Sequence, residues 1–207
     1  MESNWYPKNL MVREEGNQRT IDFLTSVYSK SKSFRYAEFG FYLGATAKRV
    51  HKLFPKSELH LFDYYSAIQK FKDDNVDDLD RYFFYGNTQR YNDSYNWNLM
   101  KLIDHNSNDT IFDYCYLDGA HTVAIDALNY FLVDKLLNTG GYIEFDDYYW
   151  SLRGSSLDPL KVPETAIQYT DEQIDSKQVK MIVDILVKTD QRYEEVVENR
   201  IYKKISP

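Results

Sequence analysis

The sequence predicts an α/β fold with a mostly parallel sheet. Short apolar runs of strand length alternate with segments whose apolar residues recur at helical spacing, and this alternation is typical of successive βαβ units. The chain has 207 residues, a length that suits one domain with a substantial core. The sequence shows no internal repeat and no low-complexity tract. We therefore expect residues 1–207 to form a single domain.

The first half of the chain predicts three strands, each linked to a helical segment. Apolar residues at helical spacing in 21–28 predict a first helix, and the next helix ends at Pro55. The acidic segment 70–80 is expected to be a solvated loop or a short helix. The predicted strands are 34–39, 59–62 and 81–85, and the predicted helices after the first are 47–54 and 97–103.

The second half predicts two further parallel strands, 111–117 and 142–145, around a helix over 123–137. On this helix the apolar side is expected to hold Ala124, Leu128, Phe131, Leu132 and Leu136. The sequence Thr139-Gly140-Gly141 is expected to end the helix. Segment 148–170 has little periodicity and predicts a binding loop or lid. A helix over 174–187 and an antiparallel hairpin of 193–197 and 201–205 complete the expected elements.

Composition excludes several classes of protein. The net charge of −7 disfavours a nucleic-acid partner, because binders of phosphate backbones normally carry a basic face. The single cysteine, Cys115, excludes an internal disulfide and a cysteine-based zinc site, and its apolar surroundings predict a core residue. No apolar run is long enough to span a membrane, and Met1 to Leu10 lacks the apolar segment of a signal peptide, so we expect a cytoplasmic protein. The aromatic residues Trp5 and Tyr6 suggest a homodimer contact.

The first candidate for ligand binding is the turn after the strand at 34–39. Glu38, Gly40, Gly44 and Thr46 form the pattern Glu-x-Gly-x-x-x-Gly-x-Thr, in which glycines permit a tight turn and a close approach to a ligand. A carboxylate at Glu38 would repel the pyrophosphate of a dinucleotide. It suits a ligand that carries an ammonium and a sulfonium group, as S-adenosylmethionine does.

Two later strand ends add to this candidate site. Asp63 follows the second strand 25 positions after Glu38 (63 − 38), where an acidic side chain can accept hydrogen bonds from ribose hydroxyls. The alternative is that Asp63 caps a helix. Asn87 and Thr88 follow the third strand and are placed to line the adenine.

Three segments carry a resemblance to a known family. They are Glu38-Phe-Gly40 with Gly44-Ala-Thr46, the run Phe112-Asp-Tyr-Cys-Tyr-Leu-Asp118-Gly-Ala-His121, and the run Gly140-Gly-Tyr-Ile-Glu-Phe-Asp146-Asp147-Tyr-Tyr-Trp150. Over nearly its full length the chain resembles class I S-adenosylmethionine-dependent methyltransferases, in particular the branch of macrocin-type sugar O-methyltransferases. Segment 151–170 departs from that branch, so the resemblance does not carry over its substrate.

The resemblance implies a Rossmann-like fold with a seven-stranded sheet, an antiparallel last strand, and helices on both faces. It also implies that S-adenosylmethionine binds at the carboxyl ends of the strands and that a methyl group is transferred to an oxygen. By motif match, Glu38 and Gly40 would face the cofactor's methionine and ribose portion, with Asp63 at the ribose and Asn87 or Thr88 at the adenine. Asp118 is a further candidate, both for cofactor binding and for catalysis.

A carboxylate cluster is expected where two neighbouring strands end. Asp118, Asp146 and Asp147 would repel one another unless a cation or hydrogen bonds compensate. Oxygen ligands favour a hard ion such as Mg²⁺, and the relatives resembled use such an ion to hold the substrate hydroxyl. The alternative is that Asp118 caps the following helix and that the other two form a solvated pair.

His121, three residues after Asp118, is the candidate general base, because histidine titrates near neutral pH and a hydroxyl acceptor must lose its proton. Its alternative role is to orient Asp118 or to support the cofactor. Tyr148, Tyr149 and Trp150 form either an aromatic wall for the acceptor or part of the core.

The sequence thus predicts an enzyme that methylates a hydroxyl of a small molecule, such as a sugar of a surface polysaccharide or a secondary metabolite. Its cofactor is S-adenosylmethionine, with Mg²⁺ as the candidate metal. The alternatives are a non-catalytic nucleoside-binding or scaffold protein of the same fold, and methylation of another class of acceptor.

Overall fold

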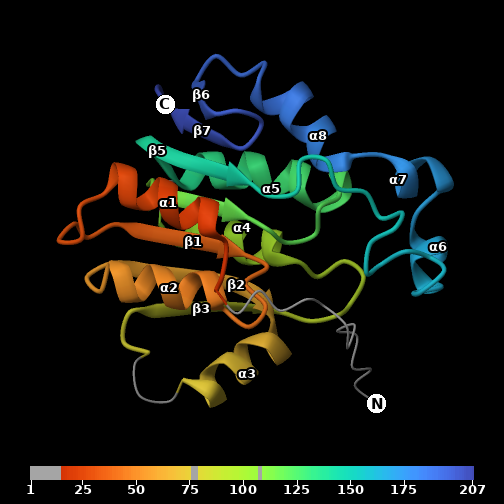
Figure 1. Cartoon of the computed structure of the whole chain (residues 1–207), viewed down its shortest axis with the longest axis horizontal. Coiled ribbons are helices and arrows are strands. Elements are labelled where there is room, and N and C mark those ends of the chain that lie inside the picture. Colours follow the sequence, from red (N-terminus) through yellow and green to blue (C-terminus); the bar gives the residue numbers. More distant parts are fainter. Residues whose placement is uncertain (1–14, 76–78, 107–108) are drawn as a thin grey trace.

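The computed structural model describes residues 15–75, 79–106 and 109–207, and this part of the chain is built around one seven-stranded sheet. The strand order is β3-β2-β1-β4-β5-β7-β6 (Figure 1). Strands β1 to β5 are parallel to one another, and β7 is antiparallel to β5 and to β6. The strands are β1 (Arg35–Phe39), β2 (Glu58–Tyr64), β3 (Tyr82–Asn87), β4 (Phe112–Leu117), β5 (Leu137–Phe145), β6 (Tyr193–Val197) and β7 (Ile201–Lys204). The predicted parallel sheet with an antiparallel hairpin at its edge is confirmed.

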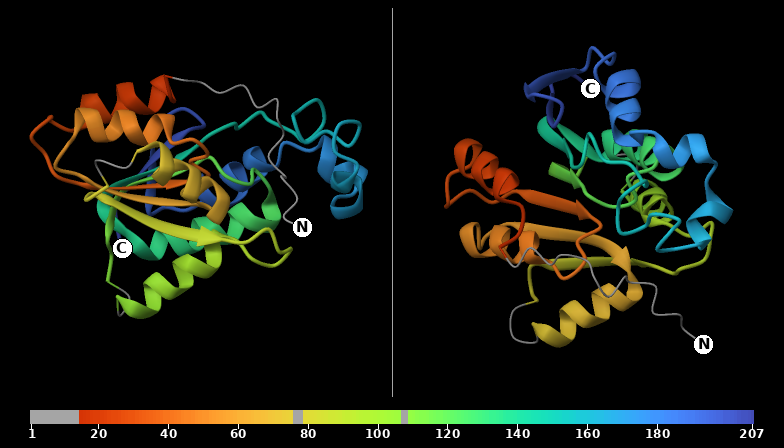
Figure 2. Two further views of the ribbon diagram at one scale, coloured as in Figure 1. Left: turned by 90° about the horizontal axis from the view of Figure 1, so that it is seen from below. Right: turned by 45° about the vertical axis from the view of Figure 1, so that its right-hand side comes forward.

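Helices cover both faces of the sheet, as expected (Figures 1 and 2). One buried cluster joins the sheet to α1 (Gln18–Val27), α2 (Ala45–Leu53) and α3 (Tyr65–Asp74). The other cluster joins it to α4 (Tyr95–His105), α5 (Val123–Leu136), α8 (Gln178–Ile182) and the π-helix η1 (Val183–Val187). Cys115 is fully buried in the second cluster, which confirms it as a core residue.

The buried side of α5 agrees with the prediction only in part, since Leu132 and Leu136 are buried as expected. Leu128 and Phe131 are half-exposed, whereas the polar Asp126, Asn129 and Asp134 are buried. The side chain of Asp126 accepts a hydrogen bond from Tyr95. Partners of this kind allow a polar residue to be buried. Because α5 carries apolar residues on both sides, its periodicity alone did not identify the core side.

The predicted helix stop at Thr139-Gly140-Gly141 is also wrong. Helix α5 ends at Leu136 and β5 begins at the next residue, which pairs with Phe112 of β4. The glycines lie inside β5, where the register with β4 shifts. Gly140 has a φ of +88°, and a Cβ on Gly141 would lie 2.9 Å from the carbonyl oxygen of Asp113. The two glycines therefore permit the irregular backbone at the start of β5 and its close approach to β4.

Segment 148–170 is mostly irregular, as predicted, but it contains the short helix α6 (Glu164–Gln168). The helix expected over 174–187 is divided into α8 and η1, and is preceded by α7 (Asp171–Asp175). In Figure 1, α6 and α7 lie on the side toward which β4 and β5 run. This region therefore stands next to the carboxyl ends of the parallel strands.

Two sequence-based expectations concern other features. Trp5 and Tyr6 lie outside the residues that the structure describes. Over the described ranges, none of the helices combines the length and the apolar character needed to cross a membrane.

Candidate active site at the carboxyl ends of the parallel strands

The ends of four parallel strands are joined by backbone hydrogen bonds into one continuous edge. The amide of Gly40 donates to the carbonyl of Phe62, and the amide of Asp118 donates to the carbonyl of Phe39. The amide of Asp146 donates to the carbonyl of Leu117 in the same way. The structure thus brings the ends of β2, β1, β4 and β5, and the predicted site residues on them, to one edge.

Gly40 is required by a close approach between two loops of this edge. Its φ is +83°, and a Cβ on it would lie 2.5 Å from both the carbonyl oxygen of Asp118 and the Cα of Gly119. A larger residue would separate the β1 turn from the β4 loop. The carboxylate of Glu38, two residues earlier, is buried and accepts a hydrogen bond of 2.9 Å from the hydroxyl of Tyr36.

Gly44 and Thr46 start helix α2. Gly44 has a φ of +70° at the N-cap of α2, and a Cβ there would lie 2.2 Å from the ring of Phe71. The hydroxyl of Thr46 accepts a hydrogen bond of 2.9 Å from the amide of Asn17. The structure gives both residues a packing role within the protein, and their contact with a cofactor stays a prediction.

Asp63 ties the β1 turn to the end of β2. One carboxylate oxygen accepts a hydrogen bond from the amide of Tyr42 and the other from the amide of Tyr64, each at 2.7 Å. The N-cap of α3 is Tyr64, so Asp63 does not cap that helix. A carboxylate has acceptor sites for about four hydrogen bonds, so these contacts are compatible with additional hydroxyl donors.

Asn87 and Thr88 lie beside Asp63, at the end of β3. In the sheet register, Gly86 pairs with Asp63 and Asn87 pairs with Tyr64. The amide and hydroxyl of Thr88 each donate a hydrogen bond of 2.6 Å to Asp93, which fixes the loop after the strand. A hollow of about 340 Å³ opens next to this loop, with walls that include Tyr65, Thr88 and Trp97. The sheet therefore places the predicted adenine residues next to the predicted ribose residue.

The three aspartates predicted as a cluster have different surroundings. Asp118 accepts a hydrogen bond of 3.0 Å from Tyr116, and it does not cap α5, whose N-cap is Thr122. Asp146 is 9% exposed and contacts Arg200 at 2.6 Å, so it is not part of a solvated pair. The side chain of Asp147 is 44% exposed.

His121 lies between two of these aspartates. Its Nε2 atom is 3.5 Å from Oδ1 of Asp118 and 3.4 Å from Oδ2 of Asp147. Burial by itself would lower the pKa of His121, but Asp147, Asp118 and Asp126 outweigh it and raise the pKa to about 9. The indole of Trp150 stands edge-on to the imidazole, with ring centres 5.1 Å apart. The arrangement offers a hydrogen-bonding nitrogen next to an aromatic surface.

Non-glycine residues in the left-handed region are concentrated at this edge. Tyr42, His121 and Asp147 have φ values of 52°, 57° and 55°, and they follow β1, β4 and β5 respectively. Strained backbone of this kind is kept where the surrounding structure holds it in place, and it clusters at functional sites. Three such residues at the ends of three strands support a binding site here.

Two acidic groups of this edge, Glu38 and Asp118, have raised pKa values. Burial raises the pKa of Glu38 well above its ordinary value, and the neighbouring Asp118 raises it further. Burial likewise raises the pKa of Asp118, with Asp146 as the next contributor. A cation that enters this edge relieves the repulsion among these carboxylates. The electrostatics therefore favour a positively charged ligand.

A buried polar network beneath the edge was not predicted. Glu144 of β5 is fully buried and contacts Arg200, Tyr114 and Thr20. Asn17, the N-cap of α1, donates a hydrogen bond of 2.8 Å to Tyr116. A glutamate inside a buried strand is a visible sequence signal, but two of its partners, Thr20 and Arg200, come from opposite ends of the chain.

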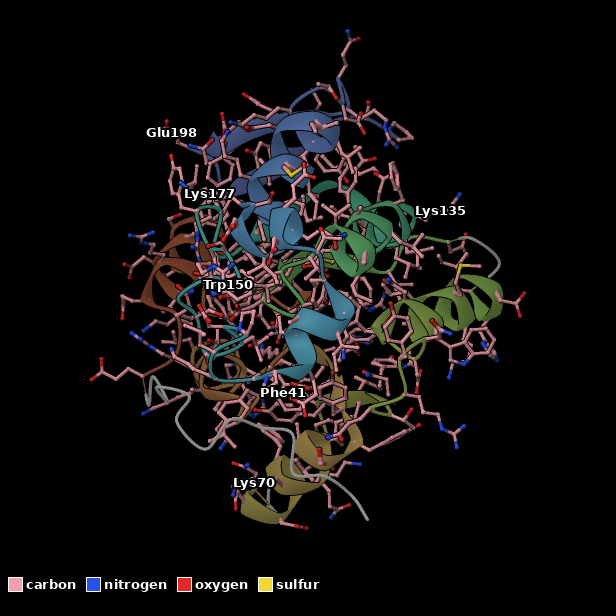
Figure 3. All side chains as sticks on the ribbon, turned by 90° about the vertical axis from the view of Figure 1, so that its right-hand side faces the viewer. Phe41, Lys70, Lys135, Trp150, Lys177 and Glu198 are labelled. Carbon is pink, nitrogen blue, oxygen red and sulfur yellow. The ribbon has the colours of Figure 1, made fainter. Side chains whose placement is uncertain are left out.

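The aromatic residues after β5 are divided between the two predicted roles. Tyr148 is buried in the core, where its hydroxyl donates a hydrogen bond of 2.7 Å to Asp184 of η1. Tyr149 is 66% exposed, and Trp150 faces His121. In Figure 3, which looks onto this side of the molecule, Trp150 lies between Phe41 of the β1 turn and Lys177 before α8.

The three predicted metal ligands are not arranged as one cluster in the structure. Over the residues that the structure describes, no group of three or more histidine, cysteine or acidic side chains is arranged to hold a metal ion. Asp118 and Asp147 both contact Nε2 of His121, whereas Asp146 is paired with Arg200. Of the three predicted ligands, Asp118 and Asp147 are therefore the two that lie beside His121.

Comparison with known proteins places this fold in a class. No family model matches the sequence, and no curated protein shows significant similarity to it. The described chain has the fold of the class I S-adenosylmethionine-dependent methyltransferases. Solved structures with this fold match it at low sequence identity, so they establish the fold alone.

Three of these solved structures illustrate how similar they are to this chain. A protein named as a caffeoyl-CoA O-methyltransferase from Staphylococcus aureus has a TM-score of 0.58 and 13% identity, over 90% of this chain and 82% of that one. The MycE methyltransferase of the mycinamycin pathway, in complex with Mg, SAH and mycinamycin VI, has a TM-score of 0.53 and 17% identity over 88% of this chain. This chain covers 48% of MycE, about half its length. Fibrillarin from Aeropyrum pernix, with natively bound S-adenosyl-L-methionine, has a TM-score of 0.55 and 14% identity, over 92% of this chain and 74% of that one.

Proposed function

We propose that this protein transfers a methyl group from S-adenosylmethionine to a hydroxyl of a small molecule. The observation that carries the proposal is the acidic edge formed by Glu38, Asp63 and Asp118 at the carboxyl ends of adjacent parallel strands. In open α/β sheets this edge is where ligands bind. The solved structures with this fold include one with S-adenosylmethionine and one with SAH, which supports the choice of cofactor.

The charge of the cofactor complements this edge. S-adenosylmethionine carries a sulfonium and an ammonium group, and a nearby cation stabilises the carboxylates of Glu38, which is buried, and of Asp118, which is partly exposed. We assign the ribose hydroxyls to Asp63 and the adenine to Asn87 and Thr88. The turn of Gly40, Gly44 and Thr46 would then enclose the methionine portion.

The chemical step needs one acceptor for a proton. The hydroxyl oxygen of the substrate attacks the methyl carbon, the bond from this carbon to sulfur breaks, and its electron pair stays on sulfur, which gives S-adenosylhomocysteine. The hydroxyl proton goes to Nε2 of His121, and Asp118 and Asp147 stabilise the resulting imidazolium. Before the transfer, the positive charge of the bound cofactor lowers the pKa of His121, because it opposes the two aspartates that raise this pKa. The neutral imidazole, which can accept the proton, is thereby favoured.

We assign Asp118 and Asp147, whose oxygens lie 3.5 and 3.4 Å from Nε2 of His121, as the carboxylates that would hold a divalent ion. Mg²⁺ is commonly held by one or two carboxylates, with water and substrate oxygens completing its shell. When bound, the ion would lower the pKa of the substrate hydroxyl. Asp146 belongs to the predicted ligand set, but its pairing with Arg200 sets it apart from the other two.

We place the acceptor against Trp150, whose ring lies beside His121. A sugar ring can pack on an aromatic face while one of its hydroxyls reaches the imidazole, so a sugar-like acceptor suits this geometry. The segment 148–170 stands at the same edge and would enclose the acceptor. The acidic net charge of −7 favours a small molecule over a nucleic acid.

An acceptor panel tests the proposal. Purified protein is incubated with S-adenosylmethionine and free sugars, sugar nucleotides, catechols or peptides, and release of S-adenosylhomocysteine is measured. We expect turnover with at least one hydroxyl compound and its loss in His121→Asn. Cofactor binding without turnover on any acceptor would favour the non-catalytic nucleoside-binding alternative.

A further inference from the structure

Arg200 contacts two carboxylates at the end of β5, those of Glu144 and Asp146. It precedes β7, and its carbonyl oxygen accepts a hydrogen bond of 2.8 Å from the amide of Phe145, which fixes Arg200 beside the end of β5. Its Nη1 atom lies 2.6 Å from Oδ1 of Asp146, and its Nε atom donates to Oε1 of Glu144 at 2.6 Å. A planar guanidinium has donors for two carboxylates at once, and here it uses them on Glu144 and Asp146.

Glu144 prevents Arg200 from leaving. The side chain of Glu144 is fully buried, and that of Arg200 is 11% exposed. If Arg200 swung toward solvent, Glu144 would be left as a buried carboxylate without its cation, which is strongly unfavourable. Tyr114 and Thr20 also donate to Glu144, but these are neutral groups. The contact between Arg200 and Asp146 is therefore a fixed part of the fold.

Asp146 differs in this respect from the other two aspartates of the edge. Oδ1 of Asp118 and Oδ2 of Asp147 lie 3.5 and 3.4 Å from the imidazole of His121, and both side chains are partly exposed. The side chain of Asp146 is 12% exposed, and Asn17 Nδ2 lies 3.4 and 3.5 Å from its two oxygens. A divalent ion on Asp146 would also lie close to the guanidinium, which is permanently charged, and like charges repel strongly where water is scarce.

We propose that Arg200 is the resident counter-ion of Asp146 and that it removes Asp146 from any divalent-cation site at this edge. Any such ion is then bound by Asp118 and Asp147 alone among the three aspartates, and Arg200 limits its affinity. This inference rests on the proposed function for the importance of the edge, but it concerns only how this chain's carboxylates are neutralised.

The test is a calorimetric titration of Mn²⁺ into the full chain without cofactor. Asp147→Asn and Asp118→Asn should each weaken Mn²⁺ binding at least tenfold, whereas Asp146→Asn should change it less than twofold. The double variant E144Q/R200Q frees Asp146 and leaves no unpaired buried charge on Glu144, so it should bind Mn²⁺ at least tenfold more tightly than the wild type. Adding Asp146→Asn to the double variant should abolish this gain.

The controls separate this effect from general loss of charge or fold. Arg153→Gln removes an exposed guanidinium that pairs with Asp175 and should leave Mn²⁺ binding unchanged. Thermal unfolding of each variant confirms that it is folded. A loss of Mn²⁺ affinity in Asp146→Asn as large as that in Asp147→Asn would overturn the inference, as would the absence of a gain in E144Q/R200Q. If the wild type binds no Mn²⁺, the inference is tested with E144Q/R200Q alone. Mn²⁺ binding by this variant would support the inference, and its absence would overturn it. Titration of S-adenosylmethionine into the wild type tests the proposed function separately.

Discussion

The amide of Tyr42 donates a hydrogen bond of 2.7 Å to the carboxylate of Asp63, and this contact joins the turn after β1 to the end of β2. Tyr42 adopts a φ of +52° to make it. The same carboxylate is assigned to the ribose of the cofactor. Asp63 therefore has both a structural and a binding role, and an experiment has to separate the two.

Asp63→Ala should reduce the affinity for S-adenosylmethionine and S-adenosylhomocysteine at least tenfold, because the ribose hydroxyls lose their acceptor. It should also lower the free energy of unfolding by about 1–3 kcal/mol, since two backbone amides lose their partner. Asp158→Ala is the matched control. Asp158 is also buried and also accepts hydrogen bonds from two backbone amides, those of Gly154 and Leu160. We expect this control to be destabilised similarly while it keeps cofactor affinity within threefold; equal losses of affinity would assign Asp63 a structural role only.

His121→Asn should lower kcat by about 10²- to 10⁴-fold, the range typical for removal of a general base. Asparagine suits the left-handed φ of 57° at this position, so the loop should keep its shape. Cofactor affinity, measured by calorimetry, should stay within threefold of the wild type. A kcat that falls less than threefold would show that another group accepts the proton.

Tyr148→Phe should lower the stability and also affect the acceptor. The variant loses the hydrogen bond to Asp184 and the contact with Lys180. We therefore expect its free energy of unfolding, measured by calorimetry, to fall by about 0.5–1.5 kcal/mol. Because Tyr148 follows Asp147 directly, the KM for the acceptor should rise while the Kd for the cofactor stays constant. Tyr149→Phe, at an exposed neighbour, should leave stability unchanged. A rise in the cofactor Kd as large as that in KM would contradict this separation.

His60 should make the fold sensitive to mild acid. It is buried between aromatic rings, and burial lowers its pKa to about 4. The unfolded chain therefore binds more protons between the ordinary pKa near 6.5 and pH 4, so the contribution of His60 is complete above that range and is lost as the pH falls through it. The loss amounts to roughly 3 kcal/mol at most.

Glu38 and Asp118 act in the opposite direction, because their pKa values are raised and they favour the folded state as pH falls. A difference measurement isolates His60 from them. Denaturant unfolding at pH 7 and pH 4.5 should show a smaller loss of stability in His60→Gln than in the wild type. The exposed His105→Gln serves as the control, and an unchanged pH dependence in His60→Gln would refute this assignment.

Much of the fold could be predicted because its signals are local. The apolar strands, the glycine turn after Glu38 and the final hairpin are each written in a few consecutive residues, and they are found at the expected places. The predicted site residues from Glu38 to Asp147 meet at one edge because parallel strands bring their carboxyl ends together.

The features that were missed depend on contacts between distant segments. The polar side of α5 is buried because Asp126 meets Tyr95, and Asp134 meets Arg192 and Tyr193. The pairing of Arg200 with Asp146 joins residues 54 positions apart. No local periodicity contains such contacts, so the sequence suggested a cluster of three equivalent aspartates where the structure has one neutralised by arginine.

Calorimetric titration of S-adenosylmethionine into the wild-type chain tests the central claim most directly. The acidic edge of Glu38, Asp63 and Asp118 predicts one site per chain with micromolar affinity, and S-adenosylhomocysteine should compete for it. The absence of both binding heat and a thermal shift with either compound would contradict the account.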